Sequence, residues 1–287
     1  MTVTVVVDLY SGRPNPTFLL TPSQEDELNE RLSGAKERSE RRPSGVFGGL
    51  GYRGIKLSRS SQHPNGPLSL HLHEGIADQG DFGANFVDDA RVEHWLADIA
   101  AEHLNESANS QVRRSLAIPP ATPHFNLKAL QGPGCPTVHA ADAPAYAPGA
   151  WNVPAVQPYN NCYNYANNQQ TNTFAQPGRG SGHPFLSLDC GGVQAAAIFD
   201  GLVQSVGFQN PLGHGQGWYV ALVIWPGTDY HWYRQDSVGC WSHKPGQTAV
   251  RNTDNAGQPI TDPNTCDRGP YTDFCTYMIT RNGVHIA

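Results

Sequence analysis

The feature that most constrains the fold of this chain is the unbroken apolar run WYVALVIW at residues 218–225. Its length of eight residues, with Gly217 before it and the turn sequence PGTD after it, favours a strand over a helix. Because no position in the run is polar, we expect this strand to lie inside a sheet that is covered on both faces.

The residues after this strand, DYHWYRQDSVGCWSH, are typical of a β-hairpin. We expect a turn at Ser237-Val238-Gly239 with Asp236 opposite Cys240. In that register Gln235 faces Trp241 and Tyr233 faces His243. Since side chains alternate along a strand, one face then carries His231, Tyr233, Gln235, Trp241 and His243.

Cys162, in PYNNCYNYANN, is the cysteine that the sequence singles out. Asn160 or Asn161 is a suitable N-cap for a short helix that begins there. The positive end of a helix dipole and a nearby imidazolium both lower the pKa of a thiol. A lone cysteine is more often a small buried apolar residue, but the polar neighbours of Cys162 favour a reactive thiol.

A cysteine and two histidines of this kind predict acyl-transfer chemistry. Cys162 is the expected nucleophile, His231 the general base, and His243 the residue that orients the base. The alternatives are a turn histidine bonded to backbone at position 231 and a surface hairpin histidine at position 243. Other candidates for the third member of the triad are Asp236, Asn252, Asp254 and Asn255. We expect Asp236 on the opposite face of the hairpin, and Asp254 and Asn255 in a turn at DNAG.

The predicted oxyanion hole uses the backbone N–H of Cys162. Candidate side-chain partners there are Gln157, Tyr159 and Asn160, each of which is also typical of a loop residue with a local hydrogen bond. Trp241 shares the face of the histidines and is a candidate substrate contact. The alternative is that its ring packs within the sheet.

The stretch GWYVALVIWPGTDYHWYRQDSVGCWSH resembles the core of the NlpC/P60 branch of papain-like cysteine hydrolases. That family has a strand, a turn, a histidine that opens the next strand, and a glycine turn before a second polar residue. His231, Gly239 and His243 match this order, with Cys162 ahead of them, over about residues 155–245. At the cysteine the chain has NNCYNYA where the family usually shows an Asp-Cys-Ser-Gly-like helix start. The resemblance implies a papain-like domain that acts on a peptide or amide.

The composition of the chain divides it near residue 150. Residues 1–150 contain 30 charged residues and residues 151–287 contain 14. We therefore expect an α+β fold with an N-terminal α+β domain at 1–108, a connector rich in Pro, Gly and Ala at 109–150, and the papain-like domain at 151–287. The expected strands are 3–10, 52–58, 67–73, 218–225 and 274–280, and the longer expected helices are 22–32, 88–104 and 189–206.

Charge and cysteine usage limit the partners and the compartment. A net charge of −6 gives no electrostatic footprint for nucleic acid or for an anionic membrane, and no apolar run approaches the roughly 20 residues of a membrane span. The N-terminal residues MTVTVVVDLYSG lack a basic region and a cleavage site, so a cytoplasmic protein with six reduced cysteines is the default expectation. Export by another route would allow a disulfide such as Cys266–Cys275.

The sequence as a whole predicts a hydrolase that cleaves an amide or peptide bond without a metal or an organic cofactor. One alternative is an acyltransferase or transglutaminase-type toxin or effector that uses the same triad. Another is a non-catalytic interaction module. A zinc hydrolase is the third. Cys240, His243 and Cys266 could bind zinc, but their spacing is irregular. In the N-terminal part, His71 and His73 share a strand face next to Glu74 and could hold a metal, but no further ligand is in register.

Overall fold

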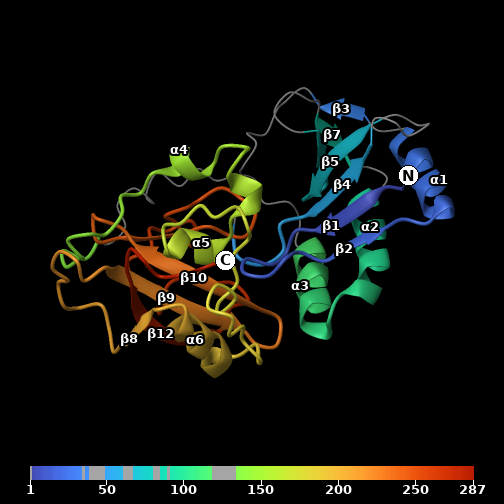
Figure 1. The fold of residues 1–287 in the computed structure, drawn as a ribbon. Coiled ribbons are helices and arrows are strands. Elements are labelled where there is room, and N and C mark those ends of the chain that lie inside the picture. Colours follow the sequence, from blue (N-terminus) through green and yellow to red (C-terminus); the bar gives the residue numbers. More distant parts are fainter. Residues whose placement is uncertain are drawn as a thin grey trace. The chain divides into compact units, whose positions relative to one another are not determined.

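The computed structural model describes residues 2–33, 36–38, 49–60, 67–79, 85–88, 91–117 and 134–287. The chain has an α+β fold with two antiparallel sheets and divides into two compact units (Figure 1). The first unit consists of Met1–Leu9, Asn15–Phe47 and Gly51–His124. The second consists of Tyr10–Pro14, Gly48–Leu50 and Phe125–Ala287, so three separate segments of the chain build it.

The first unit is a sheet with helices. In sheet order its described strands are β2 (Thr17–Leu19), β1 (Thr4–Val7), β4 (Ile55–Arg59), β5 (Leu68–His73), β6 (Ile76–Asp78), β7 (Asn85–Val87) and β3 (Lys36–Arg38). Its helices are α1 (Pro22–Ser33), α2 (Val92–Ala100), the 3₁₀ turn η1 (Ala101–His103) and α3 (Glu106–Ala117). Alternate residues of β1 are buried, as a strand with one covered face requires.

Helix α1 begins as the sequence predicts. The backbone N–H of Gln24 donates to the hydroxyl of Thr21, and the backbone N–H of Thr21 donates to Oε1 of Gln24 at 2.8 Å. This reciprocal pair satisfies two donors at the helix start, with Pro22 in the first turn. Thr21 and Gln24 thus form a capping box at the start of the predicted helix 22–32.

The start of the predicted connector is a packed helix. In α3, Ala108 and Val112 are buried, and Asn105 caps the helix by accepting the backbone N–H of Ala108 at 2.8 Å. The composition averaged over 109–150 did not indicate this helix, because the Pro- and Gly-rich part of that range begins only after residue 117. Residues 118–133 of the predicted connector lie outside the described residues.

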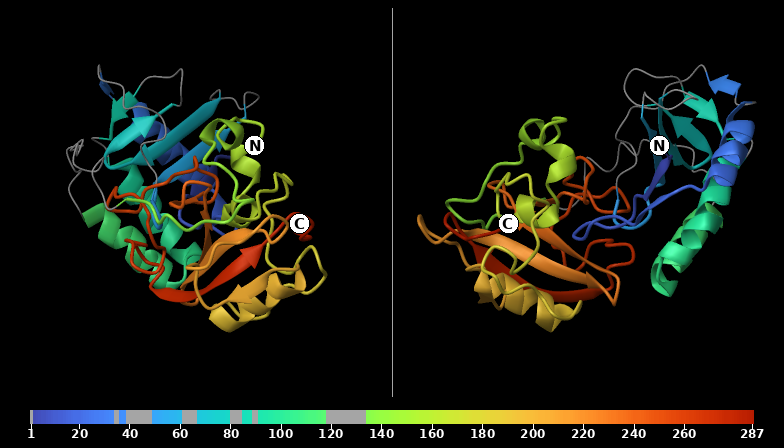
Figure 2. Two further views of the ribbon diagram at one scale, coloured as in Figure 1. Left: turned by 90° about the vertical axis from the view of Figure 1, so that its left-hand side faces the viewer. Right: turned by 45° about the vertical axis from the view of Figure 1, so that its right-hand side comes forward.

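The second unit contains the sheet that the apolar run predicts. In sheet order its strands are β11 (Trp241–His243), β10 (Asp229–Gln235), β9 (Trp218–Trp225), β12 (Asp273–Thr280) and β8 (Val203–Ser205). Its helices are α4 (Pro148–Trp151), η3 (Gln157–Tyr159), α5 (Cys162–Ala166) and α6 (Cys190–Phe199). All eight residues of β9 are buried, which confirms a strand covered on both faces. Figure 2 shows β9, β10 and β12 side by side.

The predicted hairpin register is also confirmed. Tyr233 pairs with His243 and Gln235 with Trp241. The backbone N–H of Asp236 donates to the carbonyl of Cys240 at 2.8 Å, as expected for residues opposite each other across the turn.

The two faces of this sheet are covered differently. Tyr230 and Trp232 face a core that also contains Leu222 and Ile224 from β9 and residues of α5 and α6. By strand alternation, His231 and Tyr233 lie on the opposite face. There the aromatic rings of Tyr271, Phe208 and Tyr277 pack over the hairpin residues.

Helix α6 is shorter than predicted. Its N-cap, Asp189, accepts the backbone N–H of Gly192 as expected. The helix ends at Phe199 instead of near residue 206, because Gly201 adopts a left-handed conformation with φ of 107°. Residues 203–205 then form the edge strand β8 against β12, which a helix-length estimate from the sequence could not anticipate.

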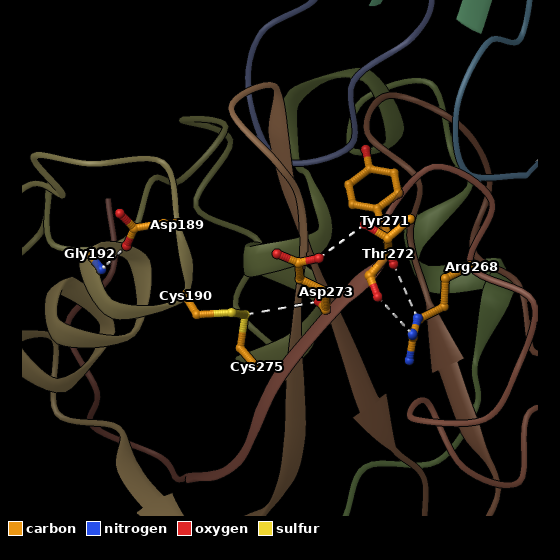
Figure 3. Close-up of a disulfide and its surroundings, with 8 residues drawn as sticks. All are labelled: Asp189, Cys190, Gly192, Arg268, Tyr271, Thr272, Asp273 and Cys275. Carbon is orange, nitrogen blue, oxygen red and sulfur yellow. Dashed lines mark hydrogen bonds between the residues drawn. A yellow bond between two sulfur atoms is a disulfide. The ribbon is translucent and has the colours of Figure 1, made fainter. Parts of the chain in front are cut away.

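Two disulfides link distant parts of the second unit. Cys135 pairs with Cys240 and Cys190 pairs with Cys275, while Cys162 and Cys266 are free. Figure 3 shows how the Cys190–Cys275 bond joins the start of α6 to β12. The expectation of six reduced cysteines is therefore wrong, and Cys266–Cys275 is not the pair that forms. No cysteine spacing identifies such pairs in advance, because connectivity depends on the fold.

The second unit also differs from the predicted range 151–287. It includes Tyr10–Pro14, Gly48–Leu50 and Cys135, the last of these bonded to Cys240. Because Cys135 is bonded to Cys240, a cut between Cys135 and residue 151 would leave the two fragments joined by this disulfide. None of the helices in the described part of the chain is long and apolar enough to cross a membrane.

We predict that removing the Cys190–Cys275 disulfide destabilises the second unit. The bond closes a loop with a sequence separation of 85 residues, so the double variant Cys190→Ser/Cys275→Ser should lose about 2–5 kcal/mol of unfolding free energy. Denaturant titration under non-reducing conditions measures this. Cys266→Ser, which changes a free and half-buried thiol, is the control and should lose less. Equal losses in the two proteins would contradict the prediction.

Candidate active site

The second unit brings the two predicted histidines into direct contact. Nε2 of His231 and Nδ1 of His243 are 2.9 Å apart, and both side chains are buried. The other ring nitrogen of His243, Nε2, lies 3.1 Å from the carbonyl oxygen of Thr253. The ring of Tyr233 stacks on His243, with centroids 5.0 Å apart, and meets the ring of His231 edge-on.

This chain of contacts determines where the protons lie when both rings are neutral. The carbonyl of Thr253 can only accept, so Nε2 of His243 carries the proton that it donates. Nδ1 of His243 is then an acceptor, and Nε2 of His231 must donate to it. The basic lone pair of His231 is thus on Nδ1. The ring of His243 is thus hydrogen-bonded to His231, the contact that the predicted orienting role requires, and is itself held by the carbonyl of Thr253.

Cys162 lies at the start of α5, which packs against β10. Asn161 is the N-cap: its side chain accepts the backbone N–H groups of Tyr163 and Asn164, and Asn164 completes a capping box. The thiol is placed beside the strand that carries His231, because the backbone N–H of Trp232, the next residue, is directed at its sulfur.

The environment of Cys162 differs from the expected one. The side chain has no exposed surface and belongs to the apolar core of the unit. Burial, helped by the negative charge of Asp229, raises the pKa of the Cys162 thiol well above its usual value. The backbone N–H groups of Trp232 and Cys162 and the charge of Lys244 oppose this but do not outweigh it. The expected lowering of the pKa at a helix start is therefore wrong for this structure, since loss of hydration has a larger effect than the end of a five-residue helix.

The alternative third members lie elsewhere. Asp236 is buried in an ion pair with Arg234 at 2.8 Å, on the opposite face from His231 as predicted. Asn252 is exposed. Asp254 accepts backbone N–H groups of Gln258 and Asp267 in the expected turn. Asn255 bonds the backbone of Leu50.

The oxyanion candidates have structural partners. The side chain of Asn160 bonds Val156 and Asn172 and so closes the loop after α5. The amide of Gln157 donates to the carbonyl of Gln247, and the side chain of Tyr159 is 54% exposed. The backbone N–H groups of Trp232 and of Cys162 both act at the sulfur, with that of Trp232 having the larger effect on the thiol.

Trp241 is fully buried, and its ring packs on Phe208 and Tyr277. These contacts match the alternative interpretation of this residue as part of the sheet packing.

One buried group near the histidines was not found from the sequence. Asp229 lies two residues before His231 and is fully buried. Its carboxylate accepts the hydroxyl of Tyr271 at 2.6 Å and the backbone N–H groups of residues 11–13. Burial raises the pKa of Asp229, and these four donors oppose the rise. Side chains alternate along the strand, so Asp229 and His231 lie on the same face. The sequence could have indicated Asp229 as an acidic residue two positions before the predicted base.

The metal alternatives find no support. Cys240 is held in a disulfide and cannot serve as a thiolate ligand, which removes one member of the set Cys240, His243 and Cys266. Nowhere in the described ranges do three or more His, Cys, Asp or Glu side chains form a group that could hold a metal ion.

These observations define the class of the protein: an α+β chain whose second unit holds a buried cysteine in the core on one face of its sheet and a hydrogen-bonded histidine pair on the other face. No family model and no solved structure matches the sequence. A region of 133 residues, 46% of this chain, is 52% identical to insoluble matrix shell protein 1 of Ruditapes philippinarum and covers 87% of that protein. The chain therefore belongs to the same family as insoluble matrix shell protein 1.

We predict that His231 and His243 both carry their proton on Nε2 when neutral. The acceptor-only carbonyl of Thr253 enforces this order along the chain of contacts. Nitrogen-15 chemical shifts of the two imidazoles distinguish the tautomers, and the exposed His285 provides a reference ring. A neutral His231 protonated on Nδ1 would contradict the assignment.

Proposed function

We propose that this protein is a cysteine-dependent amide or peptide hydrolase in which Cys162 is the nucleophile, His231 the proton carrier and His243 the orienting residue. The observation that carries the proposal is the 2.9 Å contact between Nε2 of His231 and Nδ1 of His243. It leaves the basic lone pair on Nδ1 of a histidine whose next residue directs its backbone N–H at the thiol of Cys162.

The proposed reaction has two steps. The sulfur of Cys162 attacks the carbonyl carbon of the substrate while Nδ1 of His231 takes the thiol proton. The C–N bond of the tetrahedral intermediate breaks, and His231 gives the proton to the departing amine, which leaves a thioester on Cys162. Water then attacks the thioester while His231 takes its proton. The C–S bond breaks, the carboxylic acid leaves, and His231 returns the proton to the sulfur of Cys162. An amine in place of water would complete acyl transfer, which is the transglutaminase-type alternative.

The raised thiol pKa bears on the first step. Because the pKa of Cys162 lies well above its usual value, the resting site holds a neutral thiol and not a preformed thiolate. The proton must therefore move to His231 as the sulfur attacks, which makes the orientation of the imidazole ring decisive. Substrate entry also requires movement of the residues that bury Cys162. The same opening must bring the thiol to His231, because the core that contains Cys162 lies on the face of the sheet opposite to that ring.

The order of elements is compatible with the NlpC/P60-like resemblance. A cysteine at a helix start is followed along the chain by a buried strand, a strand carrying the base and a strand carrying the orienting residue. Two disulfides support the further proposal that the protein matures in an oxidising compartment and not in the cytoplasm.

A second candidate function is suggested by the family relationship. The relative from Ruditapes philippinarum is named an insoluble matrix shell protein. This chain could by analogy serve as a component of an insoluble extracellular matrix, without catalysis. In that case Cys162 would be only a buried core residue, and its replacement would leave matrix incorporation intact.

We predict a graded loss of hydrolysis among the site variants, measured as turnover of p-nitrophenyl acetate and as acetyl-thioester at Cys162 by mass spectrometry. His231→Ala should fall by about 10²-fold or more, to the level of Cys162→Ala, because it removes the proton carrier. His243→Gln should retain more turnover than His243→Ala, since an amide can both accept from His231 and donate to Thr253.

The exposed His285 supplies the control variant His285→Ala, which should behave like the unmodified protein. Wild-type turnover no higher than that of Cys162→Ala would reject catalysis and favour the matrix function. Equal losses in His243→Ala and His243→Gln would reject the orienting role.

A further inference from the structure

The sequence motif SGRPNP at 11–16 is not used by the proposed mechanism, yet its first part belongs to the second unit. Ser11 and Gly12 are buried there, more than 140 residues before Cys162 in the chain. In Figure 1 this segment is part of the blue trace. We call residues 11–13 the SGR loop.

One side of the SGR loop binds Asp229. The backbone N–H groups of Ser11 and Gly12 donate to Oδ2 of Asp229 at 2.5 and 3.2 Å, and that of Arg13 donates to Oδ1 at 3.0 Å. Three successive N–H groups converging on one carboxylate form a nest, an arrangement suited to an anion. The Arg13 side chain adds a bond to the carbonyl of Thr228 at 2.7 Å. The loop thus fixes the start of β10, two residues before His231.

The other side of the loop binds the start of α5. The carbonyl of Gly12 accepts Nδ2 of Asn161 at 2.7 Å, Nε2 of Gln176 at 2.9 Å and the hydroxyl of Tyr230 at 3.1 Å. Asn161 is the N-cap that immediately precedes Cys162. Gly12 therefore bridges the two elements of the site, because its N–H is bonded to Asp229 and its carbonyl to Asn161.

The position of Gly12 admits no side chain. A Cβ atom built there would lie 2.3 Å from Cε2 of Tyr230, a fully buried ring. Any larger residue must therefore displace the loop or the ring of Tyr230, whose hydroxyl is bonded to the carbonyl of Gly12.

We propose that the SGR loop is a positioning segment of the proposed site, which fixes the start of α5, with Cys162, relative to the start of β10, with His231, through Asn161 and Asp229. This inference rests on the proposed function, and it makes the N-terminal sequence part of the catalytic unit. The loop itself does not touch the reacting atoms.

The test uses full-length Gly12→Ala and, as a matched control, Gly207→Ala, where the added methyl group meets open space. Two quantities are measured well below the unfolding temperature: turnover of p-nitrophenyl acetate and the rate of iodoacetamide labelling at Cys162 and at Cys266. We expect Gly12→Ala to lower turnover at least about tenfold, in line with a lost alignment of reacting groups. Its Cys162 should be labelled faster and its Cys266 unchanged, while Gly207→Ala resembles the wild type.

The two readouts separate the possible failures. Unchanged turnover and labelling in Gly12→Ala would overturn the proposal, as would faster labelling at both cysteines, which signals general unfolding. If the wild type shows no turnover above Cys162→Ala but Gly12→Ala still exposes Cys162 selectively, the proposed function fails while the loop retains its positioning role at α5.

Discussion

The complete burial of β9 is the constraint on which the second unit depends. Every side chain of this strand is apolar or aromatic, so both faces of the sheet must be covered. Helices α5 and α6 cover one face with the core that includes Trp232. Aromatic residues from the loops around β8 and β12 cover the other face, where the histidine pair lies. The site is therefore enclosed by the same packing that stabilises the sheet, and its two imidazoles have little orientational freedom.

Burial on both faces also encloses charged groups, and each of them binds distant parts of the chain. Arg234 bonds Asp236, Asn168 and the carbonyl of Ala145, and Lys244 donates to the carbonyls of Gln157 and Gly246. Asp229 takes its donors from the SGR loop and from Tyr271. A buried charge without such partners would be strongly destabilising. These groups thus explain why loops far away in sequence return to the sheet.

The parts of the structure that follow from local physics were predictable from the sequence. Strand β9, the register of the hairpin, and the caps at Thr21, Asn161 and Asp189 depend on apolar periodicity and on short polar side chains. The contact between His231 and His243 follows from that register. What escaped prediction depends on contacts between residues more than 50 positions apart in the sequence: both disulfides, the nest around Asp229 and the burial of Cys162. No local pattern encodes which distant loop supplies a donor.

The burial of Cys162 affects the mechanism that we propose for it. The core that buries the thiol raises its pKa, and the nearby Asp229 raises it further. The hydrolase that we propose could therefore not rely on a standing thiolate and would need a base whose lone pair is already directed. The hydrogen bonds from Thr253 through His243 to His231 fix the tautomer of such a base. In the proposed mechanism, this fixed imidazole tautomer takes the role that a lowered thiol pKa has in a site exposed to water.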